Sequence, residues 1–80
     1  MKNILKTISE KSVEMSPVYR QLARYILDEY AQVAHMDIST LAAAADVSTA
    51  TVTRFANSIG CSGYPDLRRQ LPPHRHLRGA

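Results

Sequence analysis

The chain has 80 residues, of which 45% are hydrophobic and 21% are charged, and its formal net charge is +3. This length holds one small domain with one core, and the composition excludes overall disorder. Alanine-rich segments with few β-branched runs predict an all-α fold, a small helical bundle.

The basic charge is unevenly distributed along the chain. Residues 1–53 contain five Lys or Arg against six Asp or Glu, a net charge of −1, whereas residues 54–80 contain five Arg against Asp66, a net charge of +4. This asymmetry favours a nucleic-acid partner over an acidic protein.

The single cysteine, Cys61, excludes an internal disulfide and a cysteine-based zinc site. We expect a buried thiol and a reducing, cytoplasmic setting. Residues 1–11 lack the apolar core of a signal peptide, and no stretch approaches the ~20 apolar residues of a membrane span. We therefore expect no membrane partner.

The first predicted helix covers residues 3–11, where Ile4, Leu5 and Ile8 share one face. That face either packs onto the rest of the domain or forms part of a dimer contact. Small regulators often pair through N-terminal helices, so a homodimer is one of two open alternatives.

A second helix is predicted to begin with Ser16 as its N-cap and Pro17 at its first position, and to continue to about residue 30. Its apolar positions form an inward stripe: Val18, Leu22 and Ile26. Arg20 and Arg24 lie one turn apart on the outer side, which is either a solvated face or a phosphate contact. Residues 31–36 are predicted to form one further helical turn.

Residues 38–60 contain two short helical patterns separated by a tight break. The helices are predicted at residues 40–45 and 49–59, which leaves residues 46–48 to turn the chain. A connection this short makes two helices cross steeply, as they do in a helix-turn-helix.

The ends of these two helices carry capping signals. Ser39 and Ser48 are placed as N-caps, and Gly60 stands where a left-handed C-terminal stop is expected. A helix-turn-helix usually has glycine where Asp46 stands, because that residue needs positive φ. Aspartate tolerates the left-handed region, so we expect a moderate strain there.

The two helices also have distinct faces. The apolar positions are Leu41, Ala42, Ala45, Val52, Phe55, Ala56 and Ile59, with Val47 as a plug in the turn. The opposite face of the second helix carries Ala50, Thr53, Arg54 and Asn57, with Thr49, Thr51 and Ser58 at its margins. No Asp or Glu lies within residues 49–59, and an acid-free face suits a phosphate-rich partner.

After Gly60 we expect a turn over residues 61–64 and a last short helix over residues 66–71, opened by Pro65. In the turn, Gly63 and Tyr64 are either structural or provide a backbone N–H and a hydroxyl for a phosphate. Residues 72–80 are predicted to be a flexible basic C-terminal tail, because two prolines end the helix and no apolar period follows.

Residues 35–68, HMDISTLAAAADVSTATVTRFANSIGCSGYPDLR, resemble the N-terminal domain of the RpiR family of bacterial transcriptional regulators. The resemblance is carried by V-S-x-A-T-V-x-R-F at residues 47–55 and I-G-x-x-G-Y-x-D-L at residues 59–67. Upstream, MSPVYRQLARYIL at residues 15–27 is similar to the family's opening L-S-x-x-x-x-x-I-A-x-Y-I-L.

The resemblance implies a homeodomain-like or winged-helix-like DNA-binding domain over residues 1–71, usually dimeric, joined to a sugar-isomerase-type (SIS) domain that senses a phosphosugar. Asp46 departs from the family's common glycine. These 80 residues contain no SIS domain, so a phosphosugar effector would need a domain absent here. The ending HRHLRGA is unlike the family's continuation and suggests a truncated or frame-shifted product, or an artificial chain end.

The leading hypothesis is a sequence-specific, DNA-binding domain of a bacterial regulator of sugar or phosphosugar genes, with double-stranded DNA as its partner and residues 49–59 in the major groove. The expected base contacts are Ala50, Thr53, Arg54 and Asn57, with Arg54 on guanine O6 and N7. The expected phosphate contacts are Ser39, Thr40, Ser48, Thr49 and Thr51, although Ser39 and Ser48 are equally suited to capping alone.

The alternative function is a helical dimerisation or protein-interaction module, or a remnant without useful DNA binding. An enzyme is not expected, because the sequence has no paired-carboxylate constellation, Gly-rich phosphate loop or metal triad. No metal or cofactor is expected either, since His35 has no partner at a ligand spacing, and His74 and His76 in the predicted tail are weak evidence for a site.

Overall fold

The computed structural model describes residues 3–72, and within that range the chain is all-α, as predicted. The helices are α1 (Ile4–Ser12), α2 (Pro17–Val33), α3 (Ile38–Ala45), α4 (Thr49–Ser58) and α5 (Tyr64–Gln70). The predicted flexible tail lies outside the described residues from position 73 onward.

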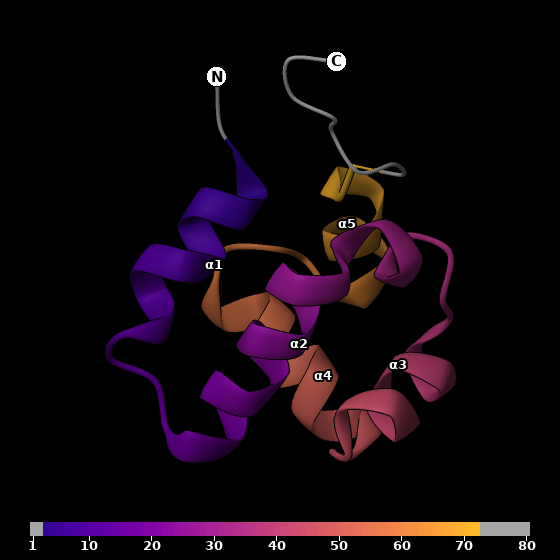
Figure 1. The fold of residues 1–80 in the computed structure, drawn as a ribbon, viewed down its shortest axis with the longest axis horizontal. Helices are drawn as coiled ribbons and strands as arrows, with labels where there is room; N and C mark the ends of the chain where they lie inside the picture. The colour runs from indigo at the N-terminus through magenta and orange to yellow at the C-terminus, as the bar shows by residue number, and fades with distance from the viewer. Residues whose placement is uncertain (1–2, 73–80) are drawn as a thin grey trace.

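Helix α2 is the central element of the bundle. It packs against α1 on one side and against α3 and α4 on the other, while α5 packs on α4. Figure 1 shows α2 passing through the middle of the molecule, with α1 along one flank and α3 on the opposite flank. The α3–α4 pair is thus supported by α2 and by α5.

One hydrophobic core unites all five helices. Among residues 3–72 no polar or charged side chain is buried. The largest fully buried side chains are Phe55, Ile8, Leu22, Ile26, Leu41 and Leu67. The thiol of Cys61 is also buried, as predicted, and the apolar face of α1 contributes Ile4 and Ile8 to this core. The first helix therefore packs onto its own domain.

The N-terminal end of α2 confirms one prediction and corrects another. Ser16 caps the helix by accepting a hydrogen bond from the Tyr19 N–H at 3.4 Å, and Pro17 is its first residue. Val18, however, is 48% exposed and does not belong to the inward stripe. Its neighbour Tyr19 fills the interhelical space, with its ring edge-on to Phe55 at a centroid distance of 5.9 Å and an interplanar angle of 87°.

The C-terminal end of α2 lies beyond the predicted boundary. The helix continues to Val33 across a kink at Glu29 (φ −122°, ψ 31°), so residues 31–33 belong to it and not to a separate turn. Burial of Val33 explains the extension, because the kink turns the last helical turn onto the core. In the described part of the chain, no helix is long and apolar enough to cross a membrane.

Candidate nucleic-acid interface

The connection between α3 and α4 has the geometry predicted for a helix-turn-helix. Asp46 is left-handed (φ 60°, ψ 47°), and the N–H of Val47 donates to the Ala42 carbonyl at 2.9 Å, which closes the end of α3. Ala42 is buried, and Val47 packs partly buried against the core. Residues 46–48 therefore suffice to connect α3 to α4, as expected.

The start of α4 is capped as predicted. The Ser48 hydroxyl oxygen accepts a hydrogen bond from the Thr51 N–H at 3.1 Å, and the two hydroxyl groups lie 2.9 Å apart. The helix ends at Ser58, one residue before the predicted end, and Gly60 follows with φ 95°. Because Ser48 and Thr51 pair with each other, a phosphate would have to share these hydroxyls.

The start of α3 corrects the predicted cap. The helix begins at Ile38, and its N-cap is Asp37, whose Oδ1 accepts a hydrogen bond from the Thr40 N–H at 2.8 Å. Ser39 therefore lies inside the helix and cannot cap it. Aspartate and serine both cap helices well, so the local sequence allows either start, and α3 uses the earlier one.

Asp37 places a negative charge at this end of α3. Hydrogen bonding from the Thr40 backbone holds the pKa of its carboxyl below the usual value, with a smaller contribution from the Arg68 charge. Ser39 and Thr40 are both exposed, but the carboxylate next to them repels phosphate. The α3 N-terminus is therefore less suited to a phosphate than its hydroxyl groups alone suggest.

The outer face of α4 collects the residues predicted to contact bases. Ala50, Thr53, Arg54 and Asn57 are all exposed, while Val52, Phe55 and Ala56 are buried behind them. Thr49 is exposed as well, and Thr51 is half-buried. Within residues 3–72 the ion pair is between Arg69 and Asp66, and the Arg54 guanidinium has no carboxylate partner there. The face can donate and accept hydrogen bonds without an acidic group to repel DNA.

For Tyr64 the structure supports the structural alternative, since its hydroxyl is not available to a phosphate. The side chain is 3% exposed, and its Oη donates to the carbonyl oxygens of Met36 at 2.8 Å and Val33 at 3.1 Å. Burial raises the pKa of this phenol, which therefore stays a neutral donor. The Arg68 Nη1 also donates to the Met36 carbonyl at 3.2 Å.

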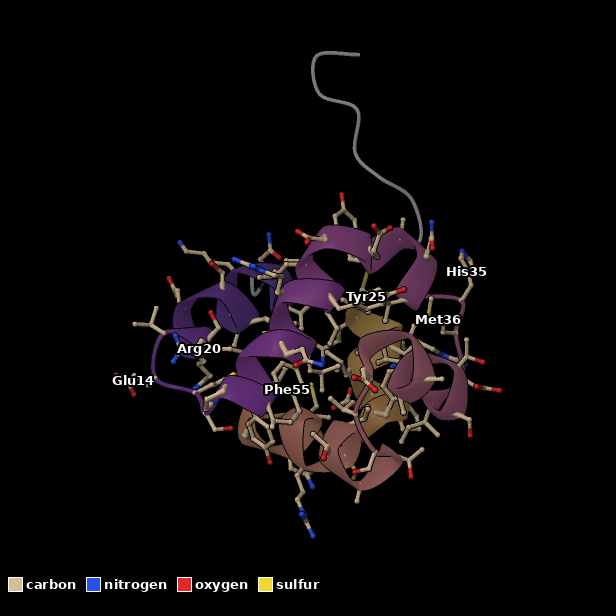
Figure 2. The ribbon with its side chains drawn as sticks, turned by 60° about the horizontal axis from the view of Figure 1, so that its bottom comes forward. Glu14, Arg20, Tyr25, His35, Met36 and Phe55 are labelled. Atoms are coloured by element: carbon tan, nitrogen blue, oxygen red, sulfur yellow. The ribbon has the colours of Figure 1, made fainter. Side chains whose placement is uncertain are left out.

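These contacts form a latch, defined here as Tyr64 and Arg68 of α5 on the Met36 carbonyl. It joins α5 to the segment between α2 and α3. Figure 2 shows His35 and Met36 in this segment, after the end of α2. The residue spacing gives no signal for such a bond, because donor and acceptor lie 28 positions apart.

A second contact joins α2 to the helix-turn-helix. The amide Nε2 of Gln21 donates to the carbonyl oxygen of Ala45, the last residue of α3, at 2.7 Å. This bond satisfies a carbonyl group at the helix end and ties α2 to the α3–α4 turn. The sequence analysis did not single out Gln21. Its outward position in α2 is the only feature of the sequence that could have indicated this contact.

A metal site is a different kind of arrangement, and the described residues do not form one. Among residues 3–72 there is no group of three or more His, Cys, Asp or Glu side chains that could hold a metal ion.

Comparison with known proteins agrees with this geometry. The chain is 44% identical over 71 residues to the HTH-type transcriptional regulator HexR of Pseudomonas aeruginosa, which covers 89% of the chain and 25% of HexR. The structure of Vibrio vulnificus NanR complexed with ManNAc-6P superposes with a TM-score of 0.81 at 33% identity, over 82% of this chain and 25% of that one.

The N-terminal domain of ybbH from Bacillus subtilis superposes with a TM-score of 0.82 at 28% identity, over 88% of this chain and 85% of that one. This chain thus spans about a quarter of the length of HexR and NanR. Residues 2–74 match the family described as helix-turn-helix domain, rpiR family. The chain belongs to the rpiR family of helix-turn-helix domains, the domain type of HexR-like transcriptional regulators.

Proposed function

We propose that this domain binds double-stranded DNA sequence-specifically by placing α4 in the major groove. The observation that carries the proposal is the exposed, acid-free face of Ala50, Thr53, Arg54 and Asn57 directly after a tight helix-helix turn. A helix presented in this way reaches base edges with its N-terminal half.

Arg54 is the residue that we assign to base recognition. Its exposed guanidinium has no carboxylate partner within residues 3–72, and its fork matches the O6 and N7 acceptors of guanine. Thr53 and Asn57 add hydrogen bonds, and Ala50 suits a thymine methyl group. Thr49, Ser48 and Thr51 are assigned to phosphates at the start of α4.

We further propose that the domain serves a regulator of sugar or phosphosugar genes in the cytoplasm, and that it acts without catalysis. NanR supports the sugar connection, since it was solved with ManNAc-6P. Effector binding would belong to an SIS domain that these 80 residues do not contain. If two copies pair with two-fold symmetry, the half-sites lie about one helical turn apart.

The decisive experiment begins with selection of binding sites from random duplexes. Fluorescence anisotropy then compares wild type and Arg54→Ala on the selected site at roughly 50 and 200 mM salt, a range over which phosphate contacts weaken strongly. We expect Arg54→Ala to weaken binding to the selected site by ~1–3 kcal/mol and to relax base preference at one position.

The matched control is Lys6→Gln, which removes one exposed positive charge from α1. It should leave the base preference unchanged. Equal affinity of wild type and Arg54→Ala for the selected site would refute the base contact. Absence of DNA binding by wild type at low salt would refute the proposed function and favour a protein-interaction module.

A further inference from the structure

A shallow groove of about 640 Å³ runs along α2 on a surface that the α4 contacts do not use. It is lined by Arg20, Gln21, Arg24 and Asp28 of α2 and by Ser12 of α1, among others. The α2 positions recur at intervals of three and four residues, so they form one continuous strip of the helix surface.

This strip adjoins the helix-turn-helix. Gln21, which lies between the two arginines, reaches the Ala45 carbonyl at 2.7 Å, and Ala45 ends α3 just before the turn into α4. In the same helical turn, Tyr19 packs edge-on against Phe55 of α4. The first two turns of α2 therefore lie directly beside the elements that would contact DNA.

The charge of the groove is predominantly basic. Arg20 and Arg24 are both exposed, and neither forms an ion pair within residues 3–72. The acidic group that lines the groove is Asp28, and Figure 2 shows Arg20 on the flank of α2 toward Glu14. Two guanidinium groups one turn apart match successive phosphate oxygens better than they match a neutral surface.

We propose that Arg20 and Arg24 bind backbone phosphates of the DNA that flanks the site read by α4. This inference rests on the proposed function and adds a second contact surface to it. The pair contributes affinity and register but no base readout, because phosphates carry no sequence information. Gln21 positions the pair by tying α2 to the turn.

The test uses two duplexes that contain the selected site, one trimmed to the base pairs that α4 reads and one extended by about a helical turn on each side. Affinities of wild type, Arg20→Gln, Arg24→Gln and Lys6→Gln are measured across a salt series, and circular dichroism verifies that each variant is folded. Lys6 is exposed on α1, so its variant matches the loss of one charge.

On the extended duplex, we expect the slope of the logarithm of the binding constant against the logarithm of salt concentration to be less steep by about 0.9 in each arginine variant. This is the value for one lost phosphate contact. Base preference should remain that of wild type. On the trimmed duplex, the arginine variants and wild type should bind equally.

Wild-type slopes for both arginine variants would overturn the flanking contact while leaving α4 recognition intact. An equal loss for Lys6→Gln, or an equal loss on the trimmed duplex, would overturn it as well, because either result indicates a general charge effect. A loss of base preference in the arginine variants would reassign the pair to direct readout.

Discussion

Asp46 is the residue on which the α3–α4 connection turns, and it is the positive-φ residue other than glycine in the described chain. A left-handed conformation costs an ordinary L residue about 1–2 kcal/mol, and aspartate somewhat less. The carboxyl group is exposed and belongs to the turn that leads into α4, in the region where a DNA backbone would approach. The residue therefore combines a backbone strain with an unfavourable charge.

Asp46→Gly should remove both effects. Relief of the strain outweighs the greater entropy that glycine adds to the unfolded chain, so we expect stability to rise by up to about 1 kcal/mol. Urea unfolding measures the change, and Ala43→Gly serves as control because Ala43 is exposed inside α3. That control should lower stability by about 1 kcal/mol. A loss of stability in Asp46→Gly similar to that of the control would contradict this account.

The helices differ in how well local sequence predicted their ends. The start of α2 at Ser16–Pro17 and the start of α4 after Ser48 were predicted, because a capping residue stands beside a clear apolar period. The start of α3 was not, because Asp37 and Ser39 are both good caps and the helix uses the earlier one. The error at the start of α3 thus arose where the local signals allow two starts, whereas the error at the end of α2 arose from the burial of Val33.

The two serines near the helix starts provide a direct test at this scale. Ser48→Ala removes the cap of α4 and should lower stability by ~1 kcal/mol, whereas Ser39→Ala lies inside α3 and should change it by less than about 0.5 kcal/mol. Thermal or urea unfolding of both variants gives the comparison. A loss for Ser39→Ala as large as that for Ser48→Ala would mean that Ser39, and not Asp37, caps α3.

At the scale of the molecule, the latch joins the last helix to the connection between α2 and α3. The fold class, the helix-turn-helix and the exposed face of α4 follow from residue periodicity. The latch does not, because it depends on how α5 docks, and the docking brings together residues far apart in the chain. For the same reason the sequence left a phosphate contact open for Tyr64. In the structure its hydroxyl donates to two backbone carbonyl oxygens.

Tyr64→Phe removes the hydroxyl and keeps the ring. We expect the free energy of unfolding to fall by roughly 1–2 kcal/mol, because the variant loses a buried hydrogen-bond donor. The Met36 carbonyl keeps the hydrogen bond from Arg68. Tyr25→Phe is the control, since Tyr25 is half-buried in α2 and its hydroxyl forms no hydrogen bond within residues 3–72. Its unfolding free energy should match wild type within about 0.5 kcal/mol. Equal stability of the two variants would show that the latch hydroxyl contributes nothing.

The latch also bears on the order in which this domain acquires its shape during synthesis. A nascent chain that has emerged from the ribosome as far as Gly60 already holds the residues of both α3 and α4, yet it lacks Tyr64 and Arg68. The segment that leads into α3 is then without the donors that hold the Met36 carbonyl. We therefore expect α3 and α4 to reach their full stability only after residues 64–70, which contact α4 and the segment before α3, have left the tunnel.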